Sequence, residues 1–215
     1  MLRGLTLAAA LALAGAGCSG ERDAVDFAGA KVRASPAPER IVWRRSRSIG
    51  SPSAGRLEGG VRLPSAGRLF VTWDPVRRRS PNREWRRYGN DRLVRTLLRV
   101  LAAYAAAHPD APRVLVGDLS RPRGGDFGRR YGGLGHASHQ NGLDVDVYYP
   151  RLDRRERPAA TRRQIDRALA QDLVDRFVDG GARFVFVGPR AGLRGPPDVV
   201  QSLPHHHDHL HVRLR

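Results

Sequence analysis

The sequence predicts a single α+β domain with a mainly antiparallel central sheet and flanking helices. Two segments carry apolar side chains at helical spacing, and several short segments have the apolar patterns of strands. These segments do not follow one another as regular βαβ units, which favours α+β over α/β. With 215 residues and 40% hydrophobic content, the chain can bury one core of its own but not two large ones.

Two amphipathic helices are predicted. The first covers residues 92–108, where apolar residues recur every three or four positions and Asn90-Asp91 can cap the start. The second covers residues 161–179, with Thr161 as a possible cap and Gly180-Gly181 as the stop.

Short strands account for the remaining apolar segments. Residues 113–119 contain a buried strand, and residues 143–149 alternate, with Asp144 and Asp146 on the face opposite to the apolar side chains. A carboxylate on a half-buried strand is costly unless it is paired or bound to a metal, so this pair points to a site. Further strands are predicted within 62–73, 184–187 and 209–214.

The N-terminal residues have the pattern of an export signal, because Arg3 precedes an apolar run at 5–17 that is too short to span a bilayer. Cys18, the only cysteine, follows directly, as in a bacterial lipobox where a lipid would be attached. The alternative is ordinary cleavage after Ala14 or Ala16, which leaves a free thiol. The predicted organisation is a signal peptide at 1–17, a lipidated N-terminus and flexible tether at 18–43, and the catalytic domain at 44–215.

The net charge of +17 comes almost entirely from arginine. Such a field attracts polyanions. The arginines are scattered and no helix or aromatic pattern typical of nucleic-acid readers is present, so nucleic acid is not expected as a partner. Anionic wall polymers or lipid head groups suit an exported protein better. A compositional bias toward arginine, with Lys31 as the only lysine, explains the charge equally well.

Seven of the eight histidines fall in two groups, one at 136–139 and one at 205–211. Imidazole is a common zinc ligand, and catalytic zinc sites use three protein ligands with one position left open. A strand at 209–214 would put His209 and His211 on one face. His139 would approach a metal from a loop, and Asp146 from a strand. The alternative for the second group is a His-rich tail that binds metal adventitiously, but the strand pattern and the separate first group argue against it.

Five stretches together resemble a known family, the penicillin-insensitive murein endopeptidases. It belongs to the wider LAS group of lysostaphin-type enzymes, D-Ala-D-Ala metallopeptidases and hedgehog domains. The resemblance implies the hedgehog/D-Ala-D-Ala-peptidase-like fold and a domain that starts before residue 48. The stretches are SIGSPSAG at 48–55, WRRYGNDRLV at 85–94, VLVGDLSRPRGGDFG at 114–128, GHASHQNGLDVDVYYP at 135–150 and HHHDHLHVRLR at 205–215.

Carried over by position, the resemblance implies one zinc ion (Zn²⁺) held by His139, Asp146 and His211. It implies His209 as the neighbouring base or transition-state stabiliser. His136 and His206 would also line the site.

The implied activity is hydrolysis of the D-alanyl–diaminopimelate cross-link between peptidoglycan stem peptides, without inhibition by penicillin. The implied location is the periplasm or the outer face of the cell membrane. Arg121 and Arg123 are candidate clamps for substrate carboxylates, unless they are solvated loop arginines. Two alternatives stay open: a D,D- or L,D-carboxypeptidase of the same fold, and a metal- or wall-binding lipoprotein without catalysis. The oligomeric state is not predicted.

Overall fold

The computed structural model describes residues 39–129 and 136–215, which lie in one compact unit, Ala37–Arg215. The predicted signal peptide, Cys18 and most of the predicted tether lie outside the described residues. None of the helices in the two described ranges has the length and apolar character needed to cross a membrane.

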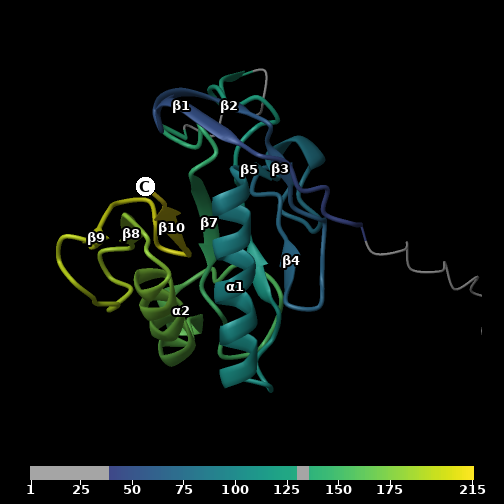
Figure 1. Ribbon diagram of the computed structural model, residues 1–215. Coiled ribbons are helices and arrows are strands. Elements are labelled where there is room, and N and C mark those ends of the chain that lie inside the picture. Colours follow the sequence, from purple (N-terminus) through teal and green to yellow (C-terminus); the bar gives the residue numbers. More distant parts are fainter. Residues whose placement is uncertain (1–38, 130–135) are drawn as a thin grey trace, which may run out of the picture. The chain divides into compact units, whose positions relative to one another are not determined.

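A six-stranded sheet with the order β4-β6-β7-β10-β8-β9 forms the centre of the unit (Figure 1). The three inner pairings are antiparallel, which confirms the predicted class and the mainly antiparallel sheet. The two edge pairings are parallel. The strands are β4 (Phe70–Thr72), β6 (Val114–Val116), β7 (Asp144–Tyr148), β8 (Phe184–Val187), β9 (Val200–Ser202) and β10 (His209–Arg213).

The parallel edge at β4 and β6 arises because helix α1 (Asp91–Ala107) connects these strands, so the chain returns to the sheet in its starting direction. The sequence pattern does not predict this connection, since β4 has only three residues. The start of α1 is as predicted, because the Asn90 side chain accepts a hydrogen bond from the Arg92 backbone N–H.

The second helix, α2 (Arg167–Asp179), starts later than predicted. Thr161 makes no capping hydrogen bond, and a short 3-10 helix, η3 (Arg162–Gln164), is followed by extended backbone at Ile165. Ile165 is buried and bridges to Arg151, which holds the chain away from helical geometry. Asp166 caps the helix instead, and its side chain accepts from the Leu169 N–H at 3.1 Å.

Helices α1 and α2 pack against each other and share one core with the apolar side chains of β7 and β10 (Figure 1). From these strands Val145, Val147, Leu210 and Val212 enter that core. Side chains alternate along a strand, so the intervening polar residues of β7 and β10 lie on the opposite face. The fold therefore presents the chemistry on the face that the helices do not cover.

Two small sheets accompany the central one. The turn-rich stretch near residue 50 forms a hairpin of β1 (Arg47–Ser51) and β2 (Ala54–Glu58), and β3 (Val61–Arg62) pairs with β5 (Tyr88–Gly89). The hairpin supports the loop before β7, since the Gln140 N–H donates to the Pro52 carbonyl at 3.0 Å. A 3-10 helix, η1 (Glu84–Arg86), precedes β5.

Residues 39–43, which the sequence assigns to the tether, contact the folded unit. Glu39 lies 3.3 Å from the guanidinium of Arg87, and Ile41 packs against the core. The guanidinium carbon of Arg95 lies 4.0 Å from the centre of the Trp43 ring.

Candidate metal centre

The pairing of β7 with β10 brings the two predicted groups together. In this antiparallel register His211 lies opposite Asp146, and Arg213 lies opposite Asp144. Opposed side chains on one face of a sheet have Cβ atoms about 5 Å apart. His209 points the same way, because it precedes His211 by two residues on β10.

His139 reaches this face from the loop before β7. Its backbone has a φ of +69°, a left-handed conformation that is strained for a residue with a side chain. Two hydrogen bonds hold it: its N–H donates to Asp144 Oδ2 at 3.0 Å, and its Nδ1 donates to the Leu119 carbonyl at 2.9 Å. With the proton on Nδ1, the neutral ring has its lone pair on Nε2.

Gly142 makes the predicted turn between His139 and β7. Its φ is +78°, and an added Cβ would lie 2.8 Å from the Leu57 side chain and 2.9 Å from the Asn90 nitrogen. Only glycine fits both the conformation and the space.

Asp146 Oδ1 lies at the centre of the group, 3.3 Å from His139 Nε2 and 3.3 Å from His211 Nδ1. His139 Nε2 and Asp146 Oδ1 are both buried, and neither has a hydrogen-bond partner within the described ranges. A buried polar atom without a partner costs about 1–3 kcal/mol. A cation between these donors would remove that cost, and two imidazoles with one carboxylate suit zinc.

A second set of donors overlaps the first. His136, His139 and Asp146 offer ligand atoms that all lie within 4.8 Å of one another. His136 and His211 are therefore both near enough to be considered as the third ligand.

Asp144 holds the two candidate ligands His139 and His211 from behind. Besides the His139 N–H, its carboxylate accepts from His211 Nε2 at 3.1 Å and from Arg213 Nε at 2.6 Å. The bond to Nε2 leaves Nδ1 of His211 facing Asp146. Both strand carboxylates belong to the site, as the sequence suggested. Of the two, only Asp146 has an oxygen that accepts no hydrogen bond from the residues that the structure describes.

The electrostatics favour cation binding. Burial by itself would raise the pKa of Asp146, but the charges of His139 and His209 hold it well below its ordinary value. Burial lowers the pKa of His139. An ionised carboxylate and a neutral imidazole are the forms that bind metals. Against burial, the hydrogen bond to Asp144 and the negative charges of Asp144 and Asp146 raise the pKa of His211 to about 9, so a metal ion there has to displace a proton.

His209 and His206 complete the group. Asp208 Oδ1 lies 2.7 Å from His209 Nδ1, which orients the other nitrogen, Nε2, toward Asp146 at 3.8 Å. Burial opposes protonation of His209, but Asp146 and Asp208 raise its pKa overall. His206 donates from Nδ1 to the Pro204 carbonyl at 2.8 Å, and its ring lies 4.9 Å from that of His209.

Behind His136 lies a buried polar network that was not predicted from the sequence. Asp118 Oδ2 lies 2.7 Å from His136 Nε2, and the same carboxylate pairs with both Nε and Nη2 of Arg86 at 2.7 and 2.6 Å. Asn82 donates to its other oxygen at 2.9 Å. Arg86 and Asp118 are fully buried. Asp118 lies in the stretch 114–128 that resembles the family, shortly after the buried strand β6. A carboxylate at that position could have indicated a buried polar site.

Comparison with known proteins identifies the family. A model of the family described as penicillin-insensitive murein endopeptidase matches residues 48–180, more than half of the chain. The chain belongs to this family. A penicillin-insensitive murein endopeptidase of Salmonella heidelberg is 30% identical over 200 residues, covering 79% of this chain and 66% of the relative. One from Escherichia coli O157:H7 is 34% identical over 131 residues, covering 61% of this chain and 41% of the relative.

In this member of the murein endopeptidase family, the six predicted site residues other than the arginines lie together. The centre of the His139 ring lies 4.6 Å from that of His136 and 4.7 Å from that of His211. The ring centres of His206 and His211 are 5.7 Å apart. Their roles as ligands or catalytic groups stay predictions.

The two predicted arginines lie in different surroundings. Arg121 donates to the Asp126 carbonyl at 2.7 Å. Arg123 is exposed and lines a cavity to which none of the six clustered residues contributes. Their role as substrate clamps also stays a prediction.

A second cavity, of about 570 Å³ in this murein endopeptidase family member, is lined in part by His207 and Asp208, the two residues before His209. Tyr148 and Asp208 line it, and the Tyr148 ring lies 5.8 Å from that of His209. Trp73 and Arg151 form part of its wall. The cavity is therefore next to the histidine that lies beside the candidate metal ligands.

Proposed function

We propose that this chain is a zinc-dependent murein endopeptidase that hydrolyses D-alanyl–diaminopimelate cross-links in peptidoglycan. One observation carries the proposal: the buried pair His139 Nε2 and Asp146 Oδ1 lie 3.3 Å apart without hydrogen-bond partners in the described part of the chain. Family membership supplies the class of substrate. The chain aligns with only 41% of the length of the Escherichia coli relative, so the activity is proposed here for this chain itself.

The proposed zinc ligands are His139, Asp146 and His211. His211 is preferred to His136 because Asp144 engages its Nε2 and leaves Nδ1 3.3 Å from Asp146, whereas His136 Nε2 is engaged by Asp118. When bound, zinc supplies Lewis acidity for an attacking water and for the scissile carbonyl.

His209 is the proposed base. Its Nε2 accepts a proton from the attacking water, while the Asp208 carboxylate stabilises the imidazolium through Nδ1. His206 and His136 are proposed to donate hydrogen bonds to the developing oxyanion or to donate a proton to the leaving amine, after which proton exchange with solvent restores them and His209. The His209–Asp208 pair favours catalysis over metal binding alone, because a storage site needs no oriented base.

The cavity of about 570 Å³ beside His209 is the proposed binding place for a stem peptide. The exposed Arg78 and Arg157 on its wall suit the free carboxylates of such a peptide.

Digestion of purified cross-linked muropeptides, followed by mass spectrometry, tests the proposal. We expect dimers to fall to monomers, EDTA to abolish this, zinc to restore it, and β-lactams to leave it unchanged. Monomers that lose only a terminal alanine would instead assign a carboxypeptidase. Activity that survives complete chelation would reject the metal mechanism.

The proposed location is the periplasm or the outer face of the cell membrane, with a lipid anchor at Cys18. This rests on the export-signal pattern, with Cys18 directly after the apolar run. Palmitate labelling that is lost in Cys18→Ala is the expected result. Labelling that is unchanged in this variant would reject the anchor.

A further inference from the structure

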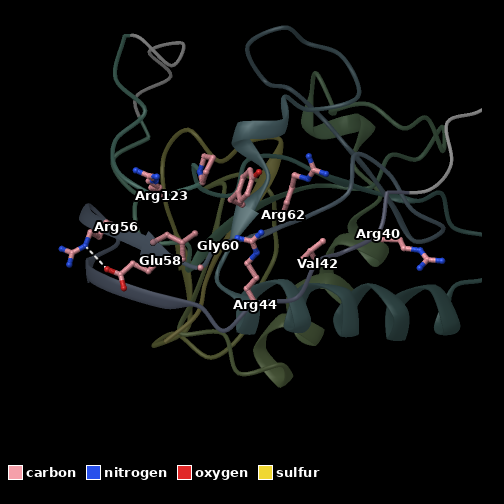
Figure 2. Close-up of a pocket in the computed structure, with 12 residues that line it drawn as sticks. Arg40, Val42, Arg44, Arg56, Glu58, Gly60, Arg62 and Arg123 are labelled. Carbon is pink, nitrogen blue, oxygen red and sulfur yellow. Dashed lines mark ion pairs between the residues drawn. The ribbon is translucent and has the colours of Figure 1, made fainter.

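Figure 2 shows the residues that line a cavity of about 680 Å³. Four segments line it: residues 40–44, the hairpin strand β2 with Gly59 and Gly60, the small sheet of β3 and β5, and the loop at 122–123. None of the candidate zinc ligands or catalytic histidines is among its lining residues.

Five arginines and one glutamate line this cavity. Arg56 lies 3.6 Å from Glu58, and Arg62 pairs with Glu84 at 2.6 Å. The other three have no carboxylate partner within the described ranges: Arg40, Arg44 and Arg123. Guanidinium groups that share one cavity repel each other, and they form strong paired hydrogen bonds with carboxylates. The charge of this cavity is therefore complementary to an anion with several carboxylates.

Arg44 and Arg123 approach the cavity from separate segments. In Figure 2, Arg44 extends from residues 40–44 toward Arg62, whereas the guanidinium of Arg40 points away. Arg123 belongs to the loop that faces β2. Because the two residues lie far apart in sequence, only the fold brings them to one cavity.

Close backbone packing builds the walls. A Cβ added at Gly60 would lie 2.8 Å from the Leu57 side chain and 3.0 Å from the Pro122 carbonyl. The Leu57 N–H donates to the Arg123 carbonyl at 3.0 Å, and Ser46 Oγ donates to the Gly59 carbonyl at 2.7 Å. These contacts hold the arginine-bearing segments in place before any ligand arrives, which reduces the entropic cost of binding.

The same packing links the cavity to the metal centre. Two residues after Arg123, the Gly125 N–H donates to the Gln140 carbonyl at 2.9 Å, and Gln140 follows His139. A Cβ at Gly124 would lie 2.0 Å from that carbonyl. One wall of the cavity is thus fixed against the loop that presents a candidate zinc ligand.

We propose that this cavity is a second binding site for a peptide that carries several free carboxylates, namely a stem peptide of peptidoglycan away from the bond that is cut. The inference rests on the proposed function for the identity of the polymer. A peptide is favoured over an anionic membrane surface because the site is concave and has a buried apolar residue, Leu57, in its wall.

Co-sedimentation with insoluble peptidoglycan tests this proposal. The full chain is incubated with EDTA, so that binding is measured without turnover. We expect Arg44→Ala combined with Arg123→Ala to weaken binding about tenfold, since two charge-assisted contacts are lost. The matched control, Arg163→Ala with Arg190→Ala, removes two exposed arginines outside the cavity and should change binding less than twofold.

A soluble stem peptide and its amidated form provide the second arm. Binding that depends on the free carboxylates and on Arg44 and Arg123 supports the site. Equal weakening in both double variants would overturn it in favour of general charge attraction. A larger effect of the cavity variant on phosphatidylglycerol vesicles than on peptidoglycan would overturn it in favour of a membrane contact. Because EDTA is present, failure of hydrolysis would not be mistaken for failure of this site.

Discussion

At the scale of single residues, the identity of the third zinc ligand, His211 or His136, can be tested directly. His136 and His211 both lie near His139 and Asp146, but they are held differently. We expect His211→Ala to weaken zinc affinity more than 100-fold, because a direct ligand is lost. His136→Ala should weaken it less than tenfold while still lowering turnover.

Competition with a chromogenic chelator measures both affinities, and unfolding curves check that each variant is folded. His139→Ala provides the reference for a lost ligand. If His136→Ala, and not His211→Ala, matches this reference, the ligand set is His136, His139 and Asp146.

The second prediction at this scale concerns the contribution of Asp118 to stability. Its carboxylate is the bidentate partner of Arg86, and both side chains are fully buried. Asp118→Asn removes the negative charge and leaves the guanidinium in a dry site, which costs about 3–5 kcal/mol. Urea unfolding at neutral pH measures the loss. Glu58→Gln, which weakens an exposed pair with Arg47, is the control and should cost no more than about 1 kcal/mol.

At the scale of elements, the start of α2 differs between the sequence prediction, which has Thr161 as the cap, and the structure, which has Asp166. Asp166 accepts a hydrogen bond from the Leu169 N–H, whereas Thr161 caps nothing. We expect Asp166→Ala to lower the free energy of unfolding by about 1 kcal/mol and Thr161→Ala to change it by less than about 0.5 kcal/mol. Chemical denaturation of both variants measures these changes. A larger loss of stability in Thr161→Ala than in Asp166→Ala would mean that the helix begins at Thr161.

In the turn after β4, Asp74 makes the stability of the fold depend on pH. Burial alone would raise the pKa of Asp74, but the Arg77 backbone N–H and the guanidinium of Arg83 lower it overall. A lowered pKa stabilises the fold above the ordinary value of about 4, and that stability is lost as pH falls through the folded-state value.

Replacing Asp74 by Asn should therefore cost about 2 kcal/mol at pH 7. The difference in free energy of unfolding between Asp74→Asn and the unchanged chain should become smaller as the pH falls below about 4. Urea unfolding at several pH values measures it. A difference that grows in acid would contradict the assigned cause.

At the scale of the whole molecule, zinc binding and folding are linked. The proposed ligands come from the loop before β7, from β7 and from β10, so they meet only in the folded chain. At free zinc 100-fold above its Kd, we expect about 2.7 kcal/mol of stabilisation. For a domain of this size that corresponds to a rise in Tm of roughly 5–10 °C. Differential scanning calorimetry with zinc and with EDTA measures it.

The matched control for this experiment is His139→Ala, which should show no such rise. An equal rise in this variant would mean that zinc binds elsewhere, for example at the exposed histidines 205 and 207.

The sequence by itself determined the elements that depend on local pattern. The alternation in β7, the spacing in α1 and the paired histidines of β10 are local properties, so each could be predicted without the fold. The matching motifs gave the family in the same way. Asp146 and His211 could be named as candidate ligands because carboxylates and imidazoles are rare on a half-buried strand face unless they are paired or have a function.

Only the tertiary structure decided what depends on distant contacts. The register that sets His211 opposite Asp146, the late start of α2 at Asp166, and the meeting of Asp118 with His136 all arise from pairings between separate segments. The cavity that joins Arg44 to Arg123 has the same origin. Local propensity carries no information on which distant partner satisfies a buried charge, because that choice is made by the packing of the whole chain.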